Sequence, residues 1–237
     1  MIENLLKPFI TEHTKIRIGP KSDSGYVLVE DPFRYSNYLL SFGVGGNIEF
    51  EKEITSKYNI QCDCYDAEPY YDIFPELLNV DSGGHIDISD RIKYHKLHIT
   101  RDNINLVIPK DINYVLKMDI EGGEWDVFDY ITDDNIKRMS MLIVELHLNN
   151  ELYRNRNFDT ITKSLSRLNK THRCIHIHGN NNEGYMQYTK GIPNVVECCY
   201  VLNDFSVNQV DYGIYPIDGL DFPCKFGVDD LSLSFWK

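Results

Sequence analysis

The stretch LKMDIEGGEWDVFDY, Leu116 to Tyr130, joins an apolar run to an acidic segment through a pair of glycines. Its five carboxylates are Asp119, Glu121, Glu124, Asp126 and Asp129. The side chains before the glycines alternate in polarity, which indicates a strand, whereas Trp125, Phe128 and Ile131 after them recur at helical spacing. The stretch is therefore predicted to form a strand, a tight turn and a helix, the unit from which parallel sheets are built.

The glycine turn divides the carboxylates into two sets. Side chains alternate along a strand, so Lys117, Asp119 and Glu121 are expected on one face, with the two acids at the carboxyl end of the strand. Glu124 and Asp126 fall in the first helical turn, where negative charge complements the helix dipole, and we interpret both as structural. Because ligands bind at the carboxyl ends of strands in open α/β sheets, Asp119 and Glu121 are candidates for function.

The same alternation of strands and helices extends along the chain. Strands are predicted at residues 38–44, 59–67, 92–99, 113–120, 140–148, 172–179 and 194–202, and helices at 47–58, 75–80, 123–131 and 158–170. The last two strands are joined by a segment without helical period, which favours an antiparallel pair. This order predicts an α/β class I methyltransferase fold: a seven-stranded, mostly parallel Rossmann-like sheet with an antiparallel C-terminal hairpin and helices on both faces.

Length, charge and apolar pattern narrow the class of protein. The 237 residues contain no repeat or linker, so we expect a single domain made of an entry segment (1–36), a core (37–203) and an extension (204–237). The net charge of −12 disfavours nucleic acid as a partner. No apolar run suits a membrane span and the N-terminus lacks the pattern of a signal peptide, so a cytoplasmic location is expected. The six cysteines lack zinc-knuckle spacing and are predicted to be mostly reduced thiols.

A glycine turn follows the first predicted strand. Gly43, Gly45 and Gly46 would let the backbone pass close to a ligand and would present N–H groups at the start of a helix. The turn departs from the G-x-G-x-x-G dinucleotide pattern because Ile48 stands where the last glycine would be. It is compatible with nucleoside binding, and an ordinary tight turn is the alternative.

An acid ends the second predicted strand. Asp66, followed by Ala67, lies about twenty residues beyond the glycines, where this fold places a carboxylate that binds the ribose hydroxyls of a nucleoside. The glycines and this acid together form a stronger signal than either alone. The alternative is that Asp66 is a surface acid or a helix cap before Pro69.

The segment KMDIEGGEWDVF (117–128) resembles the K-x-D-x-E-G-x-E-x-x-V/L-L motif of FkbM-like S-adenosylmethionine-dependent methyltransferases. Further blocks resemble that family in the same order: RIGPKSDSGYVLVED (17–31), YLLSFGVGGNIEFE (38–51), LIVELHL (142–148), HIHGNN (176–181), IPNVVECCYV (192–201) and GLDFPC (219–224). The resemblance implies that S-adenosylmethionine is the cofactor, held by Gly43, Gly45 and Gly46 at its amino acid part and by Asp66 at its ribose. It implies that Asp119 lies beside the methionine part and the substrate.

Two histidines are candidates for acid–base chemistry. Methyl transfer to a hydroxyl is helped by removal of the hydroxyl proton, and a histidine with a pKa near 6.5 suits that step. His147 ends the strand next to the one that carries Asp119, and His178 ends a later strand; we predict both as catalytic, together with Asp119 and Glu121. The alternative for each is a hydrogen-bonded role in the sheet. The remaining histidines, apart from His176, are interpreted as surface or strand-edge residues. The predicted substrate-binding residues are Glu145, His147, Asn180 and Asn181.

The predicted function is methyl transfer from S-adenosylmethionine to a small polar acceptor. A hydroxyl of a sugar or sugar nucleotide, in glycan, capsule or secondary-metabolite biosynthesis, is the first expectation and rests on the family resemblance. The alternatives are N-methylation of a small amine or amide, and a non-catalytic methyltransferase-like binding domain. Asp119, Glu121 and His147 could hold a divalent metal, but nothing in the sequence sets their mutual distances, so no metal site is predicted. The acceptor and the oligomeric state do not follow from the residues.

Overall fold

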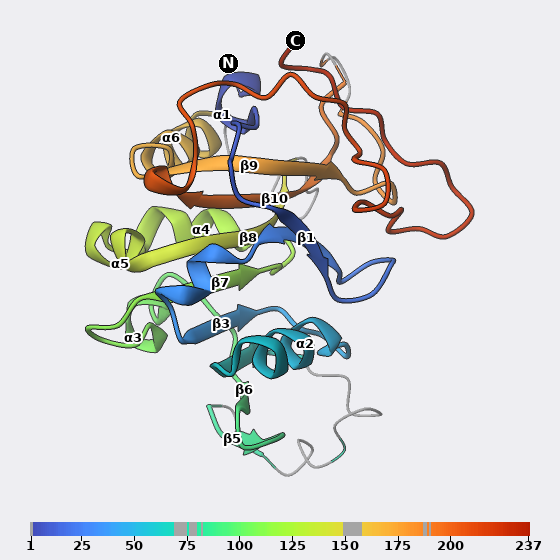
Figure 1. Cartoon of the computed structure of the whole chain (residues 1–237). Coiled ribbons are helices and arrows are strands. Elements are labelled where there is room, and N and C mark those ends of the chain that lie inside the picture. Colours follow the sequence, from blue (N-terminus) through green and yellow to red (C-terminus); the bar gives the residue numbers. More distant parts are fainter. Residues whose placement is uncertain are drawn as a thin grey trace.

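The computed structural model describes residues 2–68, 75, 80–81, 83–148, 158–186, 189 and 191–237. Its main sheet has eight strands in the order β5-β6-β4-β3-β7-β8-β10-β9 (Figure 1). The bounds are Tyr38–Phe42 for β3, Gln61–Asp66 for β4, His85–Asp87 for β5, Ile92–Lys96 for β6, Tyr114–Met118 for β7, Met139–His147 for β8, His172–Gly179 for β9 and Val195–Leu202 for β10. Neighbouring strands from β6 to β8 are parallel, whereas β10 is antiparallel to both β8 and β9. The predicted class I methyltransferase fold and its closing antiparallel pair are confirmed.

The sheet has one strand more than predicted. All seven predicted strands are present, and the eighth, β5, pairs antiparallel with β6 at the edge of the sheet. None of its three residues is buried. A strand this short and exposed carries no run of alternating apolar residues, so the sequence pattern could not reveal it.

The entry segment forms a two-stranded antiparallel ribbon, which the sequence pattern also did not reveal. It pairs β1 (Lys15–Ile18) with β2 (Tyr26–Val29), between α1 (Glu3–Leu6) and the 3-10 helix η1 (Asp31–Arg34). All four residues of β2 are buried. The ribbon crosses in front of the sheet in Figure 1, and its turn reaches the carboxyl ends of the parallel strands, where Asp23 and Ser24 line the pocket described below.

Helices cover both faces of the sheet. One face carries α2 (Glu49–Tyr58) with the β1–β2 ribbon, and the other carries α3 (Ile104–Val107), α4 (Glu124–Tyr130), α5 (Asp133–Arg138) and α6 (Phe158–Leu168). Three of the four predicted helices are present as α2, α4 and α6. The fourth, at residues 75–80, lies outside the described residues except at its two ends.

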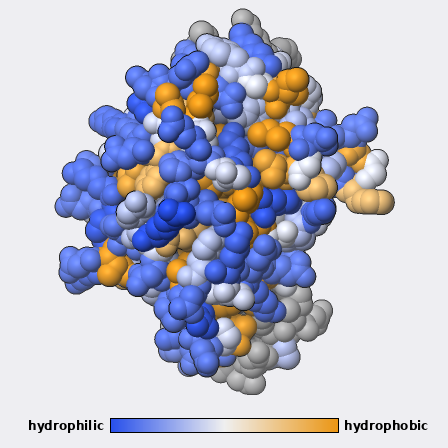
Figure 2. Space-filling view, viewed as in Figure 1, coloured by the Kyte–Doolittle hydropathy of each residue, from blue (hydrophilic) through white to orange (hydrophobic). Residues whose placement is uncertain are grey.

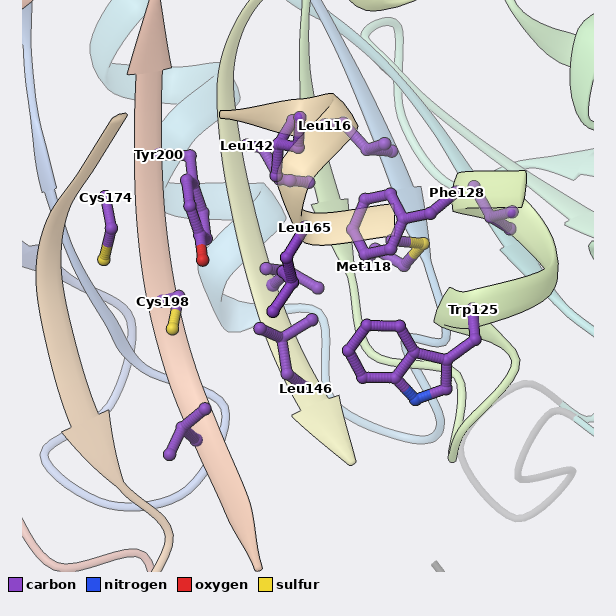
Figure 3. Close-up of a cluster of buried hydrophobic side chains, with 14 of the residues drawn as sticks. Leu116, Met118, Trp125, Phe128, Leu142, Leu146, Leu165, Cys174, Cys198 and Tyr200 are labelled. Atoms are coloured by element: carbon purple, nitrogen blue, oxygen red, sulfur yellow. The ribbon is translucent and has the colours of Figure 1, made fainter. Parts of the chain in front are cut away.

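Each face has its own apolar core, because successive side chains of a strand point to opposite faces. On β7, Leu116 belongs to the cluster under α4 and α6, whereas Val115 belongs to the cluster under α2 and the ribbon. Figure 3 shows the first cluster, in which Trp125 and Phe128 from α4 lie near Leu165 from α6. The buried strands β7 and β8 are apolar along most of their length, as parallel strands covered on both faces require.

The C-terminal extension returns to the core. Tyr215, Leu233 and Trp236 are buried in the same cluster as β7 and β8, and the Trp236 indole donates a hydrogen bond of 3.1 Å to the Asp211 carbonyl. In Figure 1 both ends of the chain lie on the side of the molecule where β9 lies. The extension is thus part of the packed structure around β9 and β10.

The face seen in Figure 2 is largely hydrophilic with scattered hydrophobic residues. Within the described part of the chain, no helix combines the length and the apolar character that crossing a membrane requires.

Candidate active site

The glycine turn after β3 packs directly against the end of β7. Gly43 has a φ of +70°, and a Cβ built on it would lie 1.6 Å from the Asp119 carbonyl oxygen, so no other residue fits without backbone movement. Its N–H donates a 2.9 Å hydrogen bond to the Tyr65 carbonyl of β4. Its own carbonyl accepts from the buried Lys117 ammonium of β7. The turn is thereby held by both neighbouring strands.

Asp66 ties the end of β4 to the same turn. One of its carboxylate oxygens accepts from the Gly45 N–H at 2.8 Å, and the other accepts from the Glu68 N–H at 2.8 Å. Gly45 also has a positive φ, of +51°. The tertiary structure therefore brings together the glycines and the acid that the sequence spacing had paired.

A pocket of about 500 Å³ opens at the carboxyl ends of β3, β4 and β7. All six predicted cofactor residues line it: Gly43, Gly45, Gly46, Asp66, Ala67 and Asp119. The volume lies within the usual range for small-molecule sites. A second hollow of about 490 Å³, at the amino ends of β4 and β6, is lined by none of the predicted site residues.

These residues fit a nucleoside cofactor. Because the glycines of the turn have no side chains, a ligand can approach its backbone closely. The Asp66 carboxylate offers acceptors for ribose hydroxyls, and Asp119 offers negative charge for a sulfonium. His98 and Leu97, which follow β6, complete the wall beside Asp66. We did not predict either from the sequence, because their position beside the pocket depends on the pairing of β6 with β4.

Asp119 lies just past the end of β7, deep in the pocket. Burial raises the pKa of its carboxyl to about 6, against the charges of Lys117 and His147, which lower it. One ligand atom each from Asp119, Glu145 and His147 lie within 4.8 Å of one another. The set considered from the sequence as a possible metal site was Asp119, Glu121 and His147, and the structure groups Glu145 in place of Glu121.

The prediction that Glu121 shares a strand face with Asp119 is wrong. β7 ends at Met118, and Glu121 adopts a left-handed conformation with φ of +55°, followed by Gly122 at +96°. The period of two therefore stops before Glu121. Its side chain is 82% exposed, and it reaches back to His147, whose Nε2 is 3.3 Å from its Oε2.

Glu124 is not the simple helix-start acid that we inferred. Its side chain is fully buried and its Oε1 accepts hydrogen bonds of 3.1 Å from the N–H groups of Ile120 and Gly122. The same oxygen lies 3.1 Å from Nδ1 of His147. Glu124 thus shapes the left-handed turn and also orients the histidine. Asp129, by contrast, accepts a 2.9 Å hydrogen bond from the Ser164 hydroxyl and so joins α4 to α6.

His147 is held between two carboxylates at the end of β8. Burial lowers its pKa, but the hydrogen bonds to Glu121 and Glu124 and the nearby charges raise it to about 11. The imidazole is therefore charged at neutral pH. Its main-chain carbonyl accepts a 2.9 Å hydrogen bond from the Trp125 indole, which joins α4 to the end of β8.

A second acid faces Glu145 from the antiparallel strand. The register of β8 and β10 places Glu197 opposite Glu145, and the register of β10 and β9 places His178 opposite Glu197. Glu145 accepts from the Asn180 amide at 2.8 Å. Burial and the charges of Asp119 and Glu197 raise the pKa of Glu145 well above its usual range.

His178 is also held between two carboxylates. Its Nδ1 is 2.7 Å from Glu197, and its Nε2 is 2.9 Å from Asp230 in the extension. Burial lowers its pKa, but its hydrogen bonds, including those to Asp230 and Glu197, raise it far more. The Cys224 thiol lies 3.5 Å from the other oxygen of Glu197. His178 therefore joins β9 and β10 to the C-terminal extension.

The two predicted asparagines have different surroundings. Asn180 contacts Glu145, so it lies within the acidic region. Asn181 is turned to the extension: its amide donates to the carbonyls of Lys225 and Val228, and its Oδ1 accepts from the Lys225 N–H at 2.7 Å. His172, interpreted as a surface or strand-edge residue, begins the edge strand β9 but is not at the surface: it is fully buried and its Nε2 lies 2.7 Å from the Met139 carbonyl.

Three residues of the region were not predicted as site residues: Asp23, Tyr26 and Glu197. The first two belong to the block 17–31 that resembled the family, which was the signal available for them. Glu197 stands in the strand segment VVECCY, and its place opposite Glu145 follows from the antiparallel register alone.

Comparisons with known proteins match the chain to one family. A family model described as the methyltransferase FkbM domain matches residues 20–174. Among solved structures, a Methanococcus jannaschii fibrillarin pre-rRNA processing protein is 12% identical, with a TM-score of 0.43, over 81% of this chain and 83% of that one. A precorrin-6y C5,15-methyltransferase from Geobacter metallireducens is 12% identical, with a TM-score of 0.38, over 72% of this chain and 83% of that one. A search of curated proteins finds no match.

The strand order and the glycine and aspartate pocket define an S-adenosylmethionine-dependent methyltransferase of class I. Because the family model covers more than half of the residues, the chain belongs to the FkbM methyltransferase family.

Proposed function

We propose that this methyltransferase acts on a hydroxyl of a small polar acceptor, with a sugar as the leading substrate class. The observation that carries the proposal is the group formed by Asp119, Glu145 and His147, whose ligand atoms lie within 4.8 Å of one another beside the cofactor pocket. A hydroxyl must lose its proton as it attacks, so it needs a proton acceptor at this place.

Asp119 suits the role of proton acceptor. With a pKa raised to about 6 by burial, it is ionised at neutral pH and is a stronger base than an ordinary aspartate. When bound, S-adenosylmethionine would supply the methyl group, with its sulfur as the leaving group. The Asp119 carboxylate would take the proton that the acceptor hydroxyl loses as its oxygen attacks.

His147 and His178 are proposed to act through their charge and their hydrogen bonds. A histidine whose pKa is raised to about 11 already holds its proton at neutral pH, so it is a poor first acceptor. The positive charge of His147 favours ionised Asp119 and Glu145. Glu121 and Glu124 hold its ring in place. His178 orients Glu197, which faces Glu145.

The charge of the region favours a neutral or cationic acceptor. Asp119 and Glu197 would repel the diphosphate of a sugar nucleotide, so a sugar or polyol without phosphate fits better. The same charge supports N-methylation of an amine as the second candidate, since an amine arrives as a cation.

The test is a methyl-transfer assay at several pH values with neutral sugars, sugar nucleotides and small amines, followed by mass spectrometry to locate the methyl. With Asp119 as the acceptor, kcat/KM should rise about tenfold per pH unit below pH 6 and level off above it, because the base acts only when ionised. Asp119→Asn should remove this dependence, and His147→Gln should lower kcat while keeping it.

Three results would contradict the proposed function or the role of Asp119 as the base. A rate that keeps rising towards pH 11 in the native protein and becomes flat in His147→Gln would make the histidine the base. Methyl found on nitrogen would favour the second candidate. Thermal stabilisation by S-adenosylmethionine without transfer to any acceptor would favour a binding domain.

A further inference from the structure

Three carboxylates converge beside Asp119, at the cofactor pocket. They come from three elements: Asp23 from the turn between β1 and β2, Glu145 from β8 and Glu197 from β10. One oxygen of each lies within 4.8 Å of the others. Glu145 and Glu197 are buried, whereas Asp23 is exposed, so the cluster is open to solvent on the side of the ribbon.

The positive charge around this cluster is incomplete. Glu197 is paired with His178, and the charged His147 lies near Glu145 but is shared with Asp119, Glu121 and Glu124. Glu145 itself accepts from the neutral amide of Asn180, and Asp23 accepts from the N–H of Ser24. In the part of the chain that the structure describes, no lysine or arginine forms an ion pair with Glu145 or Asp23. Buried carboxylates with too little positive charge around them are costly, so a further cation would stabilise the cluster.

The Tyr26 hydroxyl is an independent sign of a missing ligand. The side chain is only 3% exposed, and its hydroxyl has no hydrogen-bond partner within the described structure. The side chain lines a small cavity together with Glu197 and His178. Burial raises the pKa of the hydroxyl, and the nearby Asp119, Glu145, Glu197 and Asp23 raise it further. The hydroxyl can therefore donate to or accept from a group bound beside these acids.

We propose that Asp23, Glu145, Glu197 and Tyr26 bind a primary ammonium group of the acceptor. An ammonium nitrogen donates three hydrogen bonds of about 2.8 Å in tetrahedral directions, which places the three accepting oxygens about 4.6 Å apart. Oxygens that all lie within 4.8 Å of one another are close enough to meet this requirement.

This inference rests on the proposed function and names its substrate class. Glu145 belongs both to this cluster and to the group with Asp119 and His147, so the ammonium lies next to the position of the reacting hydroxyl. The bound ammonium keeps its proton and is not a nucleophile. The acceptor is thus an amino sugar or amino alcohol, methylated on the hydroxyl beside its amine.

The first experiment measures binding by calorimetry in the presence of S-adenosylhomocysteine. Glucosamine should bind at least about tenfold more tightly than glucose or N-acetylglucosamine, because only it offers charge-assisted hydrogen bonds to the carboxylates. Glu145→Gln and Glu197→Gln should abolish this preference, and Tyr26→Phe should reduce it. Two matched controls should retain the preference for glucosamine. Glu51→Gln changes a buried glutamate that is hydrogen-bonded to Ser41, and Tyr200→Phe changes a buried tyrosine on the opposite sheet face.

Three outcomes would overturn the proposal: equal binding of the three sugars, a preference that survives Glu145→Gln in a folded variant, or tight binding of Mn²⁺ alone that the same variants abolish. Circular dichroism shows which variants fold. Asp23→Asn, at the exposed end of the cluster, tests the same preference for glucosamine without changing a buried side chain.

The transfer assay separates this inference from the proposed function. Methylation of glucose and glucosamine hydroxyls at equal rates would support O-methylation and contradict the proposed ammonium site. Tight glucosamine binding with the methyl found on its nitrogen would contradict the proposal that the bound ammonium does not react. Tight binding that depends on Glu145, with transfer to no hydroxyl, would support the ammonium site and contradict the proposed function.

Discussion

At the scale of single residues, the close approach of Gly43 to Asp119 is the most demanding contact of the pocket. The turn has a positive φ at this residue, and the Asp119 carbonyl occupies the position where a side chain would begin. The two residues come from different strands and meet only because β3 and β7 are neighbours. The cofactor loop and the acidic end of β7 are therefore a single packed unit.

Gly43→Ala should distort this unit. We expect at least about tenfold weaker binding of S-adenosylhomocysteine and a loss of about 1–3 kcal/mol in stability, since the backbone must shift to relieve the clash. Calorimetry and chemical denaturation measure the two effects. Gly219→Ala is the matched control, because Gly219 has a φ of +77° but nothing within 4 Å of its added Cβ. Equal loss of ligand affinity in both variants would contradict the role of the clash.

Some site residues could be predicted individually and others could not. Glycines at a turn and an acid about twenty residues later are local signals, so Gly45 and Asp66 were found from spacing alone. The burial of Glu124 was missed because it depends on the left-handed turn at Glu121, which no period reveals. That turn brings two N–H groups to the Glu124 carboxylate and directs the carboxylate to His147.

At the scale of elements, the antiparallel strand β10 is the feature that builds the acceptor side. By running against β8 it places Glu197 opposite Glu145, and it carries β9 with His178 on its other edge. The sequence predicted the antiparallel pairing of β9 and β10 from the non-helical connection, but not the side-chain pairs, which depend on register.

β9 begins with a buried neutral histidine. Burial lowers the pKa of His172 to about 4, while its Nε2 lies 2.7 Å from the Met139 carbonyl of β8. The unfolded chain binds the proton more readily than the folded chain, so folding stability is lost as the pH falls from about 6.5 to about 4. The contribution over this window is about 3 kcal/mol.

Urea denaturation of the native protein and His172→Gln between pH 4 and 7 measures this effect. The stability difference between the two proteins should shrink as the pH falls. Only the native protein takes up a proton at this histidine when it unfolds at low pH, so only its stability is lowered by this group. His85→Gln, at an exposed edge position of β5, is the control and should follow the native curve. Parallel curves for His172→Gln and the native protein would contradict the assignment.

At the scale of the whole molecule, the C-terminal extension completes both the core and the polar region. It contributes buried aromatic residues such as Tyr215 to the cluster under α6. It also contributes acids to the histidines of β9: Asp221 lies 2.8 Å from His176, and Asp230 lies 2.9 Å from His178. The extension and the sheet should therefore unfold together.

Asp230→Asn should weaken this connection. The charged histidine would lose a carboxylate partner, and a hydrogen bond to a charged group is worth about 1.5–3 kcal/mol, so stability should fall by that amount at neutral pH. Chemical denaturation measures it, and amide hydrogen exchange should show faster opening of β9. Asp229→Asn is the control, since that neighbouring aspartate is exposed. Equal stability of the two variants would show that the pair with His178 contributes nothing.

The sequence by itself determined the class of fold, the glycine turn, Asp66 and the place of Asp119, because these depend on periodicity and on spacing within one βα unit or between neighbours. Only the tertiary structure decided the acceptor side. Asp23, Tyr26, Glu145 and Glu197 are separated by up to 174 positions in the chain, from 23 to 197, and their meeting depends on strand register and on the ribbon that crosses the sheet. Contacts of this kind leave no local pattern. The proposed role of the stretch LKMDIEGGEWDVFDY therefore depends on residues from other strands, which its own sequence does not reveal.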